Sequence, residues 1–138
     1  MDARTGWTIA LTALSGPVGA VATGAALARI ADATQGGMAG LAAGVGGLFI
    51  GGPIFALAVF TVCVLALARP RRRGVSIACM LGACVVDGIA VLLGLAAVAR
   101  TEASEAGLIA VALVSMGVLG VGAWLALKVG NSRRRAQV

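Results

Sequence analysis

The sequence contains no histidine and no tyrosine, and charged residues make up only 12% of the chain. A soluble domain keeps roughly a quarter of its residues charged. A chain that is 60% hydrophobic and has so few charges cannot cover itself with polar groups, so its surface must face lipid. The lack of histidine also removes the side chain most often used as a general base or as a haem ligand. We therefore expect an integral membrane protein.

Sequence patterns typical of enzymes are also missing. The chain has no P-loop, GxSxG, HExxH or CxxC motif. Cys63, Cys79 and Cys84 lie within apolar runs, where thiols usually pack as small hydrophobic groups. Met80 and Cys84 share a helical face that would admit a Cu(I) ion, but an apolar packing role is the simpler interpretation. We expect no enzymatic activity, no cofactor and no metal.

Four apolar runs are each long enough to cross a bilayer as a helix. They cover residues 7–28, 41–68, 75–99 and 108–130, and a basic tail over 131–138 follows the end of the last run. At ~1.5 Å per residue the first run reaches about 33 Å, enough for a hydrocarbon core ~30 Å thick. The polar segments 29–40 and 100–107 are expected to be loops. The sequence therefore predicts an all-α membrane protein, a single domain of four transmembrane helices in an antiparallel bundle.

The basic residues predict how the chain is threaded, because cytoplasmic loops carry an excess of Lys and Arg. With the N-terminus inside, the cytoplasmic side would hold Arg4, Arg69, Arg71, Arg72, Arg73, Lys128, Arg133, Arg134 and Arg135. Only Arg29 and Arg100 would face outward. We therefore expect a multi-pass protein of the plasma (inner) membrane with both termini in the cytoplasm.

The excess of basic over acidic residues, 11 against 5, would indicate nucleic acid if the protein were soluble. Here the arginines flank apolar runs, so we expect the lipid bilayer as the partner and no nucleic acid. Two interpretations of the triplets Arg71–Arg73 and Arg133–Arg135 remain open. They either orient the chain only, or they also bind anionic lipid headgroups on the cytoplasmic side.

Glycines recur at helical spacing in the first two runs. Gly16 and Gly24 lie on one face of the first run, and the second run has a face formed by Gly40, Gly44, Gly47 and Gly51. Helices in lipid associate through close packing at such small residues. We expect these faces to contact another helix, of the same chain or of a second copy. One functional hypothesis is therefore a non-catalytic subunit of a membrane complex, or a self-associating protein.

The second run would reach about 42 Å at ~1.5 Å per residue, more than a perpendicular span requires. Pro53 has no N–H and frees the carbonyl of Phe49. The helix either bends there or breaks into a re-entrant segment; we predict a kinked continuous helix. Each half of the chain also closes with Leu-Ala-Leu shortly before three arginines. Two parallel-repeat hairpins that arose by duplication, or a chance likeness, would both explain this.

No other Asp, Glu, Lys or Arg lies as deep within a predicted span as Asp87. It is about 18 Å from either end of its run at ~1.5 Å per residue. Inserting it costs ~2.5–3.5 kcal/mol, and no Lys, Arg or His is available at that depth. The polar groups expected near the same depth are Ser15, Ser115 and the carbonyls freed by Pro17 and Pro53. Because burying an unpaired carboxylate is costly, we expect Asp87 to be neutral when nothing is bound.

Two roles remain open for Asp87. As a neutral acid it would donate one hydrogen bond to a freed carbonyl and hold the helices together, which agrees with a packing subunit. As an exchanging group it would form a buried proton or cation site at the centre of the bundle. The second functional hypothesis is therefore a small proton- or cation-coupled transporter or channel built around Asp87.

Overall fold

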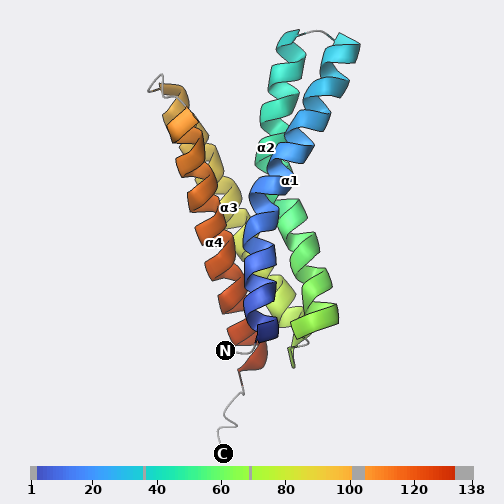
Figure 1. The fold of residues 1–138 in the computed structure, drawn as a ribbon, viewed down its shortest axis with the longest axis vertical. Helices are drawn as coiled ribbons and strands as arrows, with labels where there is room; N and C mark the ends of the chain where they lie inside the picture. Colours follow the sequence, from blue (N-terminus) through green and yellow to red (C-terminus); the bar gives the residue numbers. More distant parts are fainter. Residues whose placement is uncertain (1–2, 36, 69, 101–104, 133–138) are drawn as a thin grey trace, which may run out of the picture.

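The computed structural model describes residues 3–35, 37–68, 70–100 and 105–132; for residues 35, 37–45, 48, 49, 68 and 105 it describes only the backbone. Apart from residues 70–72 and 132, this part of the chain is helical, with α1 (Ala3–Gln35), α2 (Gly37–Cys63), a π-helical turn η1 (Val64–Ala68), α3 (Arg73–Arg100) and α4 (Glu105–Asn131) (Figure 1). Four helices are long and apolar enough to cross a membrane, and they pack against one another. The prediction of an all-helical protein with four helices of spanning length is confirmed.

Large apolar side chains cover the outside of the bundle. Val18, Val62 and Leu93 are 61%, 63% and 66% exposed. By contrast, Asp87 and several hydroxyl-bearing side chains are buried. A protein in water would place these two kinds of side chain the other way round. This distribution fits a chain whose outer surface faces lipid, because polar groups in lipid must find their partners inside the protein.

The loop predicted over residues 29–40 is wrong for most of its length. Helix α1 continues to Gln35 and α2 begins at Gly37. Alanine is the strongest helix former, and Thr34 Oγ1 donates a hydrogen bond to the Ile30 carbonyl at 2.9 Å within the last turn. The 33 residues of α1 reach about 50 Å at ~1.5 Å per residue. The α1–α2 pair therefore extends past the ends of α3 and α4 at the top of Figure 1.

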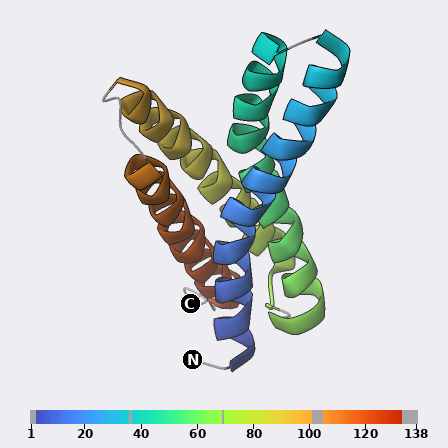
Figure 2. The ribbon, with the colours of Figure 1, turned by 45° about the horizontal axis from the view of Figure 1, so that its top comes forward.

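Helices α1 and α2 cross near their middles, and both change direction close to the crossing (Figures 1 and 2). Each contains a proline in its interior, Pro17 in α1 and Pro53 in α2, and an interior proline is the usual cause of such a bend. Because α2 runs through Pro53 without interruption, the predicted continuous helix is confirmed and a re-entrant break is excluded.

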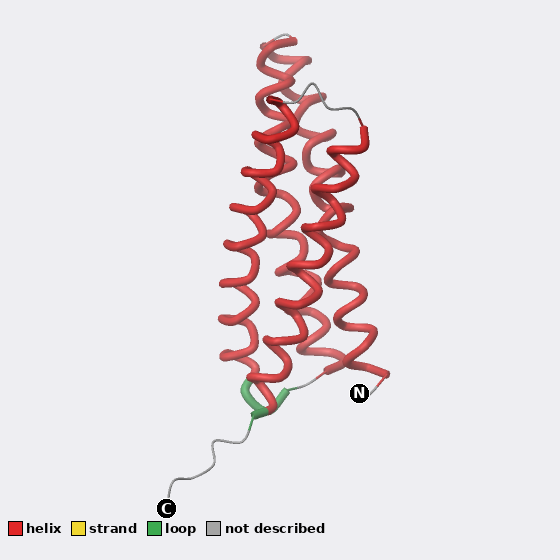
Figure 3. Tube along the Cα trace, turned by 90° about the vertical axis from the view of Figure 1, so that its left-hand side faces the viewer, coloured by secondary structure: helices red, strands yellow, loops and turns green. Residues whose placement is uncertain are grey.

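The α1–α2 pair and the α3–α4 pair converge at one end and separate towards the other (Figures 1 and 2). At the end where they converge, the short link before α3 lies beside the end of α4 (Figure 3). There the Arg72 N–H donates to the Gly130 carbonyl at 3.0 Å, and Ser76 Oγ donates to the Ala126 carbonyl at 2.9 Å. We call this the closed end and the opposite end the open end.

The hydrophobic core occupies the half of the bundle next to the closed end. Its buried members come from α2, η1, α3 and α4: Ala56, Phe60, Val64, Met80, Cys84, Leu119, Ala123, Ala126 and Leu127. Asp87 lies one turn beyond Cys84 on α3 and therefore marks the inner edge of this core.

Candidate functional site

Asp87 is fully buried. Helix α3 carries a single buried stripe, which comprises Ser76, Met80, Cys84, Asp87 and Gly88. Met80 and Cys84 each follow the preceding member by four residues, and Asp87 and Gly88 follow Cys84 by three and four, so all five lie on one face of a helix. Asp87 therefore lies on the same face of α3 as the core residues, and this face points into the bundle.

The partner of Asp87 comes from α4. Ser115 Oγ donates a hydrogen bond to Asp87 Oδ2 at 3.1 Å, and Ser115 is itself buried. A hydroxyl can donate or accept, so this contact persists whether Asp87 is charged or neutral. The other carboxyl oxygen, Oδ1, is buried and has no hydrogen-bond partner among the described residues. Buried polar atoms without a partner are rare and costly, so Oδ1 is an unused hydrogen-bond acceptor inside the bundle.

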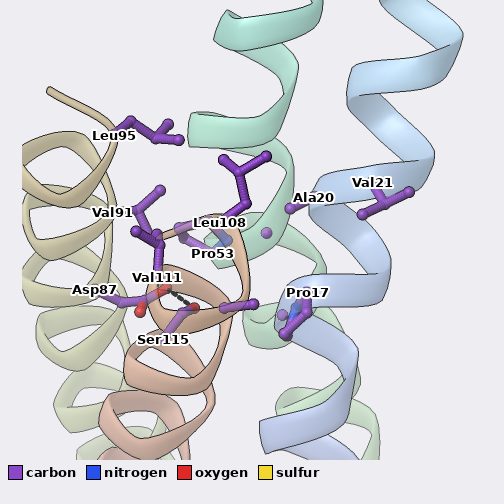
Figure 4. Close-up of a pocket in the computed structure, with 13 residues that line it drawn as sticks. Pro17, Ala20, Val21, Pro53, Asp87, Val91, Leu95, Leu108, Val111 and Ser115 are labelled. Carbon is purple, nitrogen blue, oxygen red and sulfur yellow. Dashed lines mark hydrogen bonds between the residues drawn. The ribbon is translucent and has the colours of Figure 1, made fainter. Parts of the chain in front are cut away.

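A cavity of about 210 Å³ begins at Asp87 and Ser115. All four helices line it (Figure 4). Its other walls include Pro17 and Val21 from α1, Pro53 from α2, Val91 and Leu95 from α3, and Leu108 and Val111 from α4. Asp87 and Ser115 are the only polar side chains among its described lining residues. The site is therefore one carboxyl group at the base of an apolar chamber.

No counter-charge accompanies Asp87 in the described part of the chain. The other charged residues whose side chains are described are exposed: Arg4, Arg29, Asp32, Arg71, Arg72, Arg73, Arg100 and Lys128. Lys128 instead places Nζ 4.7 Å from the centre of the Trp124 ring. An isolated carboxylate in such surroundings is costly, and burial without a counter-charge favours the neutral acid.

The five residues predicted for this site do not all meet. Asp87, Ser115, Pro17 and Pro53 line one cavity. Ser15 is buried, but its Oγ donates to the Thr12 carbonyl of its own helix at 2.8 Å, and it does not line the cavity. The described partner of Asp87 is the Ser115 hydroxyl, whereas the helix-joining role considered for Asp87 had a carbonyl freed by proline as its partner.

The predicted glycine faces lie at contacts within the chain. A Cβ atom built on Gly47 would lie 2.8 Å from the Gly24 Cα, and one on Gly51 would collide with Thr23, so both glycines allow α1 and α2 to cross closely. Gly16 faces the side chain of Leu119 on α4 in the same way. The packing of Gly40 and Gly44 lies outside the residues whose surroundings are described.

Sequence reasoning missed two parts of the site. One is Gly52, where an added Cβ would lie 3.0 Å from the Gly16 carbonyl oxygen; its place beside Gly51 and Pro53 was an available signal. The other is the apolar wall formed by Val91, Leu95 and Val111. Nothing in the sequence separates these residues from other apolar residues of the same helices.

The two arginine triplets are described only in part. Arg71, Arg72 and Arg73 are exposed at the closed end. The second triplet, Arg133–Arg135, lies outside the described residues.

Comparisons with protein-family models, with curated proteins and with solved structures find no match. The fold and composition define the class, a protein with four apolar helices of membrane-spanning length. Any narrower function has to be inferred from the Asp87 cavity itself.

Proposed function

We propose that this chain is a non-enzymatic membrane protein that exchanges a proton for a cation at Asp87, as a small proton- or cation-coupled transporter. One observation carries the proposal. Asp87 is fully buried, and its Oδ1 has no described partner. The residue also lines a cavity to which all four helices contribute.

The exchange follows from the cost of charge in apolar surroundings. Without a cation, Asp87 is favoured as the neutral acid. A cation that enters the cavity supplies the charge that a carboxylate needs, and the proton leaves to water. A proton and a cation therefore compete for the same oxygen atoms, and the net charge of the site is the same in both states. Competition of this kind couples the movement of one ion to that of the other.

A purely structural role would use Asp87 differently. A carboxylic acid that only joins helices would be expected to have both oxygens engaged, since each unsatisfied buried polar atom costs ~1–3 kcal/mol. Here one hydrogen bond to Ser115 joins α3 to α4, and Oδ1 is left over. The unpaired Oδ1 therefore supports proton–cation exchange at Asp87 rather than a role limited to joining two helices.

The decisive test uses purified protein in liposomes that contain a pH-sensitive dye. A cation gradient should drive proton movement in the wild type, and Asp87→Asn should abolish it, because asparagine keeps the size and hydrogen bonding but cannot titrate. Asp32→Asn is the matched control, because Asp32 is exposed near the end of α1, and it should leave the flux unchanged. Proton-linked flux that survives Asp87→Asn would contradict the proposal.

We also propose the orientation. The four helices would lie antiparallel in the plasma (inner) membrane, with both termini and the link at 69–74 in the cytoplasm. The closed end would then face the cytoplasm and anionic headgroups, and the open end would face outside. Single cysteines at Arg72 and Asp32 should react with impermeant reagents from the cytoplasmic and the outer side, respectively. Labelling of position 72 from outside would overturn this orientation.

A second candidate function rests on the space between α2 and α3. There Ile50, Ile54, Val85 and Ile89 border a groove of about 280 Å³, and these apolar side chains are exposed. A helix of another membrane subunit, or of a second copy, would cover them. In this case the protein acts through helix packing alone. The mass of the intact lipid-bound particle, with any co-purified protein identified, separates this function from transport by a monomer.

A further inference from the structure

We propose that the cation bound at Asp87 is a small organic ammonium ion with at least one N–H and an apolar body. This inference rests on the proposed function and names the substrate class of that site. It separates such an amine from two other cations that a carboxylate would attract, a bare metal ion and a quaternary ammonium ion.

This cavity offers too few oxygen ligands for a bare metal ion. Calcium takes six to eight oxygen ligands, and magnesium requires a near-ideal octahedron. The side-chain oxygens that line the cavity belong to Asp87 and Ser115, and those two side chains already bond each other. The described residues also contain no group of three or more His, Cys, Asp or Glu able to hold a metal. A metal ion would therefore have to keep most of its water against hydrocarbon walls.

The apolar walls favour an organic body instead. Val91, Leu95, Leu108 and Val111 present hydrocarbon to the cavity, together with the two prolines (Figure 4). An apolar group that fills this space excludes water and strengthens the ion pair at its base. The volume of about 210 Å³ lies below the ~300–1,000 Å³ of pockets for drug-sized ligands. The ligand should accordingly be small.

The free oxygen selects for a hydrogen-bond donor. Oδ1 of Asp87 has no described partner, and a charge-assisted N–H bond to it would be about twice as strong as a neutral one. A quaternary ammonium has no N–H to offer. Such ions are usually held by aromatic rings, and no aromatic residue is among the described lining residues. An amine with an N–H therefore meets the site better than its fully methylated analogue.

Binding should release one proton. The neutral carboxylic acid loses its O–H proton to water, and the resulting carboxylate pairs with the ammonium ion. The nearest other titratable group on the same helix is the thiol of Cys84, one turn away on α3. From α1, α2 and α4, no charged side chain among the described residues faces the cavity. Among the described residues that line the cavity, Asp87 is thus the only group that can supply the proton.

The test compares two cations that differ by one methyl group, N,N-dimethylbenzylammonium and trimethylbenzylammonium, on the full chain in lipid nanodiscs. Calorimetry in two buffers of different ionisation enthalpy gives both the affinity and the protons released. We expect the dimethyl ion to bind about tenfold tighter, the size of effect that one charge-assisted hydrogen bond of 1.5–3 kcal/mol supports. We also expect it to release one proton for each ion bound.

Two pairs of variants assign this binding to the cavity. Asp87→Asn should lose binding of the dimethyl ion, and Asp32→Asn should retain it. Should Asp87→Asn fail to fold, a second pair leaves the acid untouched. Ala112 lines the cavity and Ala110 is exposed on the same helix. Ala112→Leu should therefore weaken binding at least about tenfold, because the larger side chain takes up cavity space where the ligand would bury its apolar surface, and Ala110→Leu should not.

The outcomes separate this inference from the proposed function. If proton flux depends on Asp87 but neither benzyl ion binds, the substrate class is wrong and the exchange site stands. Equal binding of the two ions overturns the hydrogen-bond selection. Proton release by Na⁺, K⁺ or Mg²⁺ that depends on Asp87 overturns the organic cation in favour of a metal ion. If the amine binds but no proton flux depends on Asp87, the proposed ligand class stands and the proposed exchange function is wrong.

Discussion

The closed and open ends of the bundle are made of the same four helices but pack differently. At the closed end Phe60, Met80 and Leu119 have no exposed surface, and side chains from three helices interlock in one core. Beyond Asp87 the helix pairs separate, and a cavity of about 210 Å³ lies between them. Asp87 belongs to both regions, because it lies in the last turn of the buried stripe of α3 and lines the cavity.

The difference follows from which helices the small residues bring together. Gly47 and Gly51 let α2 approach α1 closely. In the other pair, Gly94 of α3 contacts Val111 of α4, and Gly122 of α4 contacts Ala83 of α3. Each pair is thus held internally over much of its length. The large core side chains that join one pair to the other lie at the closed end. A motion of one pair against the other would therefore change the surroundings of Asp87 before it disturbs either pair.

The largest expected effect tests the closed end. Leu119 is fully buried, and its side chain packs on Gly16 of the other pair. Leu119→Ala should lower the free energy of unfolding by about 2–5 kcal/mol, because the removed atoms leave a cavity that the bundle fills only in part. Denaturant titration of the protein in mixed micelles measures this change.

Leu113 supplies the matched control for that measurement. It lies on the same helix and is 62% exposed, so Leu113→Ala should leave stability nearly unchanged. Equal losses at positions 119 and 113 would mean that the closed end is not the main site of packing between the pairs.

A smaller effect is expected within the α1–α2 pair. A Cβ at Gly47 would lie 2.8 Å from the Gly24 Cα, whereas one at Gly46 would have nothing within 4 Å. Gly47→Ala should therefore cost about 1–3 kcal/mol, the usual range for overpacking. Gly46→Ala should be neutral or slightly stabilising, since alanine is the better helix former. The same titration measures both variants, and equal behaviour would show that the crossing is not set by Gly47.

The level of the site along the helices is the part that the sequence predicts well, because Asp87, Ser115, Pro17 and Pro53 line one cavity. Counting along apolar runs at ~1.5 Å per residue gives a level in the bilayer, and this counting grouped Asp87 with Ser115, Pro17 and Pro53. It does not give the direction in which a side chain points around its helix. Ser15 shows the consequence, because its hydroxyl bonds the Thr12 carbonyl of its own helix and stays out of the cavity.

The separation of the helix pairs is the part that the sequence does not predict. A valine that lines a cavity and a valine that faces lipid are chemically alike, so Val91 and Val111 carried no signal. The helical course of residues 29–35 was missed for another reason. Polarity marks where a chain leaves the hydrocarbon, but a helix can continue into water when its residues favour it.

The smallest expected effect concerns the hydrogen bonds that fasten the closed end. Ser76 Oγ donates to the Ala126 carbonyl at 2.9 Å and so joins the start of α3 to α4. Hydrogen bonds between helices in membranes contribute ~0.6 kcal/mol on average and ~1.7 kcal/mol at most, so Ser76→Ala should cost about 1 kcal/mol. Ser132→Ala is the control, because the exposed Ser132 hydroxyl bonds the nearby Val129 carbonyl at 2.9 Å and so joins no two helices, and it should cost almost nothing. If the closed end is the fixed part of the bundle, Ser76→Ala should also speed hydrogen exchange at the amides of 72–76, where the Arg72 N–H bonds Gly130. Unchanged exchange there, together with unchanged stability, would show that the large side chains alone hold this end closed.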